Sequence, residues 1–165
     1  MLIGHLSDFH LFSAGTPHSP LIRPDIADAL RRVVADVAAF TPAIDVVALT
    51  GDVTDCGSDE GDALLRDEAA PLPARILAIP GNHDHTGNFR RAFADILPFD
   101  DGEFAQYEVV HGGVRFLALD TVIPNRVEGR LCPRRLAWVE RKLAEPFAGP
   151  TTILMHHPPH TSGLA

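Results

Sequence analysis

Side chains that bind metal ions follow four short apolar runs of the sequence. Carboxylate, amide and imidazole groups gather there, directly after residues that suit buried strands. The four segments are Ser7-Asp8-Phe9-His10, Gly51-Asp52-Val53-Thr54-Asp55, Gly81-Asn82-His83-Asp84 and His156-His157. Each segment alone is also explained as a turn, because Gly, Asn and Asp favour turns. Together they form a set of groups that would repel one another unless a cation lay among them.

The donor types predict which cations such a site would hold. Mixed oxygen and imidazole ligands suit Mn, Fe, Co, Ni or Zn, whereas an all-oxygen site would favour Mg or Ca. Cys56 and Cys132 lack metal-type spacing, so a thiolate site is not indicated. Four segments supply enough ligands for two ions if one carboxylate bridges them. Two ions about 3.5–4 Å apart are an arrangement that hydrolyses phosphate esters.

Alternating strands and helices are predicted to position these segments. Strands are expected at residues 2–6, 44–50, 75–79, 104–110, 114–119 and 151–155, and helices at 26–37, 59–70, 89–96 and 133–143, with a loop at 13–24. This order predicts an α/β fold with a mainly parallel sheet covered by helices. Because ligand sites lie beyond the carboxyl ends of parallel strands, we expect the four segments to meet at one edge of the sheet.

Length, charge and cysteine content predict the number of domains, the type of partner and the cellular location. The chain has 165 residues, 45% of them hydrophobic, which suits a single domain over 1–165. A formal net charge of -8 makes nucleic acid an unlikely partner. No apolar run reaches the roughly 18–20 residues that span a bilayer, and the first residues do not resemble a signal peptide. With only two cysteines, the expected location is the cytoplasm.

The ordered combination of motifs resembles the calcineurin-like metallophosphoesterases. The resemblance rests on Asp8-x-His10, Gly51-Asp52-x-x-Asp55, Gly81-Asn82-His83-Asp84 and His156-His157-Pro158-Pro159, and it covers nearly the whole chain. It is strongest to the bacterial cyclic-nucleotide and glycerophosphodiester phosphodiesterases. Any one motif is weak evidence, but four mechanistically linked motifs in order are specific. The resemblance implies an αββα sandwich of the metallophosphatase type.

The resemblance also implies the ligands of two divalent metal ions, with Mn, Fe, Zn and Co as the candidates. Asp8 and His10 would bind the first ion, and Asn82 and His156 the second. Asp52 would bridge the two ions.

Further residues are assigned to the reaction. By resemblance, His83 would face the scissile phosphate, and Asp55 would orient the His83 ring. His85 and His157 lie beside the proposed site and are predicted to contact the substrate, although exposed loop positions explain both equally well. Asp120 ends another strand and is either a supporting residue of the site or a cap.

The predicted reaction is hydrolysis of a phosphodiester by a hydroxide that bridges the two ions, with His83 stabilising charge or protonating the leaving oxygen. A cyclic nucleotide or a glycerophosphodiester is the expected type of substrate. The alternative is a scaffold that keeps the fold without turnover, or an inactive fragment. Retention of the ligand residues argues against a scaffold.

One feature of the family is missing from the sequence. Family members carry a later Gly-His-x-His motif, whose histidines complete the two metal shells, and no such motif occurs before Ala165. We therefore predict that the sandwich is incomplete at its C-terminus. The chain is either a fragment of a longer protein, which its apolar last residues favour, or a naturally shortened member of the family. An open sheet edge in such a fragment would allow pairing with a second copy, as a homo-oligomer. His160 is a weak candidate for a replacement ligand.

Overall fold

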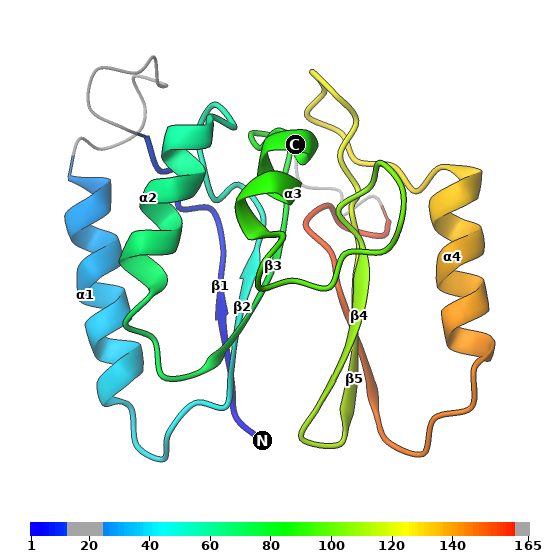
Figure 1. Ribbon diagram of the computed structural model, residues 1–165, viewed down its shortest axis with the longest axis horizontal. Helices are drawn as coiled ribbons and strands as arrows, with labels where there is room; N and C mark the ends of the chain where they lie inside the picture. The colour runs from blue at the N-terminus through cyan, green and yellow to red at the C-terminus, as the bar shows by residue number, and fades with distance from the viewer. Residues whose placement is uncertain (13–24, 161–165) are drawn as a thin grey trace.

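Two β-sheets lie face to face between helices in the computed structural model, which describes residues 1–12 and 25–160 (Figure 1). The first sheet has the order β1-β2-β3 and all its strands are parallel. Its strands are β1 (Ile3–Leu6), β2 (Val46–Thr50) and β3 (Arg75–Ile79). Its helices are α1 (Ile26–Ala39), α2 (Asp59–Ala69) and α3 (Thr86–Phe93). α1 and α2 lie on the side of this sheet that faces away from the second sheet, and α3 is drawn in front of the end of β3 in Figure 1.

The second sheet has the order β4-β5-β6. Its elements are β4 (Tyr107–His111), β5 (Val114–Ala118), α4 (Pro133–Ala144) and β6 (Thr151–Leu154). β4 and β5 form an antiparallel hairpin, whereas β5 and β6 are parallel and α4 connects them across the outer face of the sheet (Figure 1). The predicted αββα sandwich is thus confirmed.

The structure corrects two details of the prediction. His156 follows β6 in the second sheet, so the four polar segments do not share one edge of one sheet; three come from the first sheet and one from the sheet that faces it. The helix expected at 89–96 begins earlier, at Thr86, with His85 as its N-cap. The predicted loop at 13–24 lies outside the described residues.

The central strand of the first sheet, β2, is buried on both of its faces. All five residues of β2 are buried, and the β-branched and aliphatic residues of this run suit a strand covered on both faces. The register pairs Leu6 with Leu49 and Thr50 with Ile79. The carboxyl ends of the three strands are therefore level, which places the segments that follow them side by side.

A buried tyrosine connects the two sheets. The hydroxyl group of Tyr107, on β4, donates a hydrogen bond to the carbonyl oxygen of Ala78 (2.8 Å) and accepts one from its amide (2.9 Å). Ala78 belongs to β3, the edge strand of the first sheet, and Tyr107 is fully buried. Burial raises the pKa of the Tyr107 phenol, so it keeps its proton at neutral pH. This contact fixes how the two sheets are placed relative to each other.

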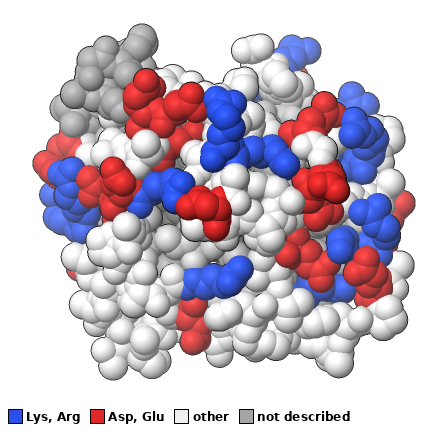
Figure 2. Space-filling model, viewed as in Figure 1, with Lys and Arg blue, Asp and Glu red and all other residues white. Residues whose placement is uncertain are grey.

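Charged side chains of both signs cover the surface (Figure 2), and the expectation that nucleic acid is not a partner stays a prediction. On the face shown in Figure 2, lysine and arginine side chains are interspersed with aspartate and glutamate. Some of them form ion pairs, such as Arg31 with Glu68 and Arg66 with Asp95. Within residues 1–12 and 25–160, no helix has the length and apolar character needed to cross a membrane. The cytoplasmic location and the single domain stay predictions.

The buried carboxyl group of Asp62 on α2 leads to a prediction about stability. Neither of its oxygens has a hydrogen-bond partner in the described part of the chain. Burial, followed by the charges of Asp84 and Asp59 and opposed by that of Arg91, raises the pKa of Asp62 to about 7. The folded state therefore holds a proton that the unfolded chain releases near pH 4, and the stability gained from it is lost as the pH rises through 7.

We expect Asp62→Asn to remove this pH dependence. The variant and the wild type should be equally stable near pH 4, and the variant should be more stable by roughly 2–4 kcal/mol at pH 8. Urea unfolding followed by circular dichroism at both pH values measures the difference. Asp67→Asn, at an exposed position of the same helix, is the control. Equal stability of Asp62→Asn and wild type at pH 8 would contradict the prediction.

Candidate metal centre

Backbone hydrogen bonds place the segment after β1 against the segment after β2. The amide of Asp8 donates to the carbonyl of Gly51 (3.1 Å), and the amide of His10 donates to the carbonyl of Asp52 (2.9 Å). Leu11 continues the contact by donating to Val53 (3.0 Å). The parallel pairing of the strands thus extends into the two loops, and this brings Asp8 and His10 to Asp52.

The backbone at these positions is in an uncommon conformation. Among the described residues, the non-glycine residues with positive φ are Asp8, His10, Asp52 and Asn125, at 60°, 49°, 48° and 61°. Left-handed backbone costs about 1–2 kcal/mol for a residue with a side chain, and such strain is concentrated at functional sites. Three of these four residues are predicted metal ligands.

Two glycines make room for the histidine that comes from the second sheet. A Cβ atom on Gly51 would lie 2.5 Å from Nδ1 of His156, and Gly51 also has a φ of +92°. A Cβ atom on Gly81 would lie 2.3 Å from the amide nitrogen of Asp52 and 2.9 Å from Cδ2 of His156. These close approaches explain why the segments after β2 and β3 begin with glycine.

Asp52 lies at the centre of the cluster. Its Oδ1 atom is 3.4 Å from Nε2 of His156 and accepts a hydrogen bond from the amide of His83 (2.9 Å), while Oδ2 is 3.7 Å from Nε2 of His10. Two groups of possible ligands share this carboxylate. They are His10, Asp52 and His83, and Asp8, Asp52 and His156, with ligand atoms within 4.8 Å of one another in each group.

These groups overlap with the pairs implied by the resemblance but are not identical to them. Asp8 lies within reach of His156 as well as of His10, whose Nε2 atom is 4.0 Å from Oδ1 of Asp8, and His83 lies close to His10 and Asp52. Asn82 is beside the second group, since its Oδ1 atom is 3.3 Å from Nε2 of His156. All five predicted metal ligands are thus in one place, and their role as ligands stays a prediction.

The surroundings of His156 show that the donor set fits a cation. Nδ1 of His156 donates to the carbonyl oxygen of Thr50 (2.8 Å), so Nε2 of the neutral ring presents a lone pair. That lone pair faces oxygens of Asp52 and Asn82, and only a proton or a cation relieves the repulsion. Burial lowers the pKa of His156, but the hydrogen bonds to Asp52 and Thr50 outweigh it and raise the pKa to about 8.

The pKa of Asp52 changes in the opposite sense. Burial raises the pKa of this carboxyl group, whereas the hydrogen bonds from His156 and from the His83 amide lower it more, so that the net shift is downward. Asp52 is therefore ionised at neutral pH although only 4% of it is exposed. A buried carboxylate with a histidine on either side is a ligand set that suits divalent transition metals.

Asp55 lies beside His83, as the resemblance implied. Nδ1 of His83 is 3.1 Å from the carbonyl oxygen of Asp55 and 3.2 Å from its Oδ1 atom. Oδ1 of Asp55 is also 3.6 Å from Nδ1 of His10, whose ring packs edge-on against that of His83. Asp55 thus contacts two histidines of the site, where we had expected one.

The sequence interpretation missed the role of Asp84. This buried carboxylate accepts hydrogen bonds from the amides of Gly81 (2.8 Å), Val53 (3.2 Å) and Thr54 (2.9 Å), and from the Thr54 hydroxyl (2.9 Å). It therefore holds the loop after β2 against the loop after β3. Its place in Gly-Asn-His-Asp was noticed, but a positioning role cannot be told from a turn role by residue type.

A cavity of about 420 Å³ opens beside His83 and is the candidate substrate cleft. Asn82, His83 and His85 line one side of it. Val122, Pro124 and Asn125, from the loop after β5, also line it. His85 is thus where a substrate contact was predicted, although its Nδ1 atom accepts a hydrogen bond from the Asn88 amide (3.3 Å) as a helix cap.

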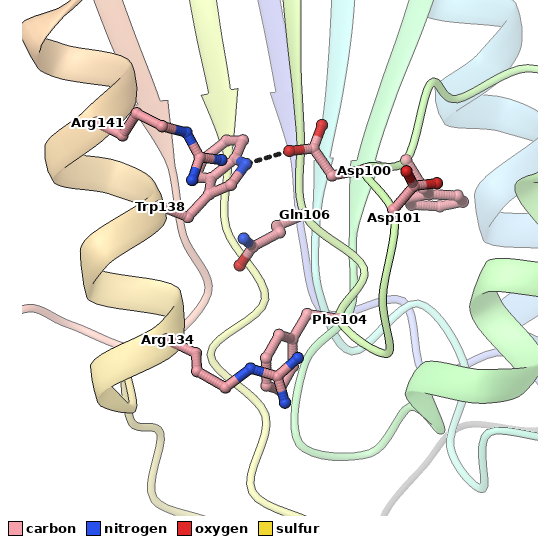
Figure 3. Close-up of a pocket in the computed structure, with 8 residues that line it drawn as sticks. Asp100, Asp101, Phe104, Gln106, Arg134, Trp138 and Arg141 are labelled. Atoms are coloured by element: carbon pink, nitrogen blue, oxygen red, sulfur yellow. Dashed lines mark hydrogen bonds between the residues drawn. The ribbon is translucent and has the colours of Figure 1, made fainter.

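A larger cavity of about 540 Å³ lies between α4 and residues 99–106 (Figure 3). There the indole of Trp138 donates a hydrogen bond to Asp100, and Arg134 and Arg141 border the space. None of the predicted site residues lines it. The smaller cavity beside His83 is therefore the one relevant to the metal centre.

Two other residues singled out in the sequence lie apart from the ligand groups. His157 is not among the residues that line the cleft of His83. Asp120 is buried and accepts hydrogen bonds from the amides of Ala105 (3.0 Å) and Val122 (2.9 Å) and from Arg135 (3.3 Å). Asp120 therefore caps the end of β5 and fixes the loop that follows, as one of its two predicted roles required.

Together, the sandwich fold and the donor atoms at its strand ends define an α/β protein with a candidate metal centre. A family model described as calcineurin-like phosphoesterase matches residues 1–164, so the chain belongs to the calcineurin-like phosphoesterase family.

Curated relatives include two kinds of bacterial phosphodiesterase. The chain is 29% identical over 167 residues to a glycerophosphodiester phosphodiesterase of Enterobacter lignolyticus, with 100% of the chain and 59% of the relative covered. It is 33% identical over 161 residues to a 3′,5′-cyclic adenosine monophosphate phosphodiesterase of Pseudomonas aeruginosa, with 96% of the chain and 56% of the relative covered. The chain thus spans less than two thirds of the length of these relatives.

A solved structure shows the same fold. The purple acid phosphatase PPD1 from yellow lupin seeds is similar to this chain with a TM-score of 0.58 and 16% sequence identity, over 87% of this chain and 27% of the lupin protein. At that identity the likeness establishes the fold alone.

The close approach at Gly81 predicts the effect of a single methyl group. Gly81→Ala should lower the free energy of unfolding by about 1–3 kcal/mol, because Cβ would collide with the backbone of Asp52 and with the His156 ring. Gly4→Ala is the control, since its Cβ would meet Ile44 at an ordinary 3.4 Å. Thermal unfolding of both variants tests this. Equal stability of the two variants would show that the Asp52 loop can move away at little cost.

Proposed function

We propose that this chain forms the catalytic site of a metal-dependent phosphodiesterase that acts on a small phosphodiester of the cyclic-nucleotide or glycerophosphodiester type. The observation that carries the proposal is the convergence of ligand side chains from both sheets on Asp52, next to a cleft lined by His83. Membership in a phosphoesterase family and the names of the relatives support it.

Two divalent ions, with Mn, Fe, Zn and Co as candidates, fit the side chains that gather on either side of Asp52. Asp8 and His10 would hold one ion with Asp52, and Asn82 and His156 would hold the other with the same carboxylate, which leaves the His83 ring free for the substrate. When bound, such ions supply charge neutralisation for the phosphate oxygens and a water of lowered pKa. The protein residues contribute by fixing these groups in place, through the hydrogen bonds that the loops make to one another.

His83 is the residue proposed to act on the substrate. Its side chain is 39% exposed and lines the cleft. Asp55 accepts the hydrogen of Nδ1, which sets the tautomer and leaves Nε2 for the substrate. From this position His83 would donate a proton to the leaving oxygen or stabilise the charge that develops there.

We expect His83→Ala to lower kcat by about 100- to 10,000-fold, the usual contribution of a general acid. Hydrolysis of bis(4-nitrophenyl) phosphate by the Mn²⁺-loaded chain measures it. The control is His111→Ala, at the end of the β4 hairpin and away from the ligand groups. A kcat within a few-fold of the wild type would show that His83 is not the catalytic group.

We also expect Asp52→Asn to reduce bound metal from two ions per chain to less than one, because both groups lose their shared carboxylate. Elemental analysis after desalting measures the content, with Asp36→Asn on α1 as the control. Wild-type protein that retains less than one ion and gains no activity from Mn²⁺ would instead favour the scaffold alternative.

A further inference from the structure

The loop at residues 121–130, between β5 and α4, forms one wall of the candidate substrate cleft. Val122, Pro124 and Asn125 line the cleft together with His83. The two ends of the loop are joined, since the amide of Arg130 donates to the carbonyl of Thr121 (2.8 Å). Whatever fixes this loop therefore sets the width of the space beside His83.

His157 spans the loop with both nitrogens of its ring. Nε2 lies 3.0 Å from the carbonyl oxygen of Val127, and because a carbonyl only accepts, Nε2 is the donor. Nδ1 then accepts from the hydroxyl of Thr121, at 2.7 Å. Thr121 is at the base of the loop, whereas Val127 is near its tip and is 77% exposed. One side chain thus connects the base and the tip of the loop to the end of β6.

The loop also packs directly on the imidazole. A Cβ atom on Gly129 would lie 2.1 Å from Cγ of His157, so the backbone of the loop rests on the ring. On its other side, the ring of His157 packs edge-on against that of His156, with 4.9 Å between the centroids. Two successive residues therefore face the metal centre and the cleft wall respectively.

We propose that His157 is a positioning residue that holds loop 121–130 as the wall of the substrate cleft and thereby selects substrates by the size of the group beside the phosphate. The inference rests on the proposed function, because it takes the cleft of His83 to be the substrate cleft. His157 acts on the substrate through the loop and not by direct contact, since both of its ring nitrogens are used.

The test compares three variants of the full chain. His157→Leu removes both hydrogen bonds. His157→Gln keeps them, because its amide can donate to Val127 and accept from Thr121. Gly129→Ala keeps the His157 side chain but forces the loop and the imidazole ring apart. Elemental analysis first establishes that all three variants bind as much Mn²⁺ as the wild type. A change in kinetics then cannot be due to metal lost from the neighbouring His156.

Two readouts are measured on each variant. Trypsin cleavage after Arg126, followed by mass spectrometry, reports release of the loop without reference to activity. Steady-state kinetics with bis(4-nitrophenyl) phosphate and the smaller methyl 4-nitrophenyl phosphate show how well the cleft accepts diesters of different size. For His157→Leu and Gly129→Ala we expect faster trypsin cleavage and a KM for bis(4-nitrophenyl) phosphate that differs about tenfold from the wild-type value. The kcat for this diester, and both kcat and KM for methyl 4-nitrophenyl phosphate, should change far less. His157→Gln should resemble the wild type in both.

Other outcomes would contradict the proposed role of His157 or the proposed function. A lower kcat in His157→Leu with unchanged trypsin cleavage, and normal kinetics in Gly129→Ala, would mean that His157 acts on the reacting atoms. Faster cleavage with unchanged KM values would mean that the loop is not a substrate wall. If the Mn²⁺-loaded wild type hydrolyses neither diester, the proposed function fails, whereas active wild type with three unaltered variants refutes this inference alone.

Discussion

The arrangement of this protein depends on one buried carboxylate, that of Asp52. Histidine nitrogens approach it from two sides. Both groups of candidate ligands include this carboxylate, so the two groups lie next to each other. Electron-pair donors at such distances repel one another without a cation. The surrounding hydrogen bonds, including those of Asp84, supply the rigidity that keeps the donors together against this repulsion.

The backbone around Asp52 is arranged for the same purpose. Left-handed conformations at Asp8, His10 and Asp52 turn each chain segment sharply, so that short loops present side chains to a common point. Glycines at 51 and 81 allow the loops and the His156 ring to approach one another without a side chain between them. The sandwich core, with the Tyr107 contact between its sheets, supplies the stability that offsets this local strain.

Much of this could be predicted from the sequence, and the limits have physical causes. Apolar runs followed by Asp, Asn and His are local patterns, so the strands and the five ligand candidates were found directly. Which strands pair is decided by contacts between distant segments, and the residues around His156 do not show that β6 joins β5 instead of the first sheet. The roles of Asp84 and His157 were also hidden, because hydrogen bonds to loop backbone leave no pattern of residue types.

The division of the ligands between two sheets has a consequence for how the centre is assembled. His10, Asp52 and His83 follow strands of the first sheet, and all three of its described strands have been made once the chain has reached β3. The other group needs His156, whose partner Thr50 is 106 positions earlier in the chain. Contacts of such high sequence separation form late. During synthesis, one group of candidate ligands is therefore assembled well before the other, which forms only after β6 has joined the second sheet.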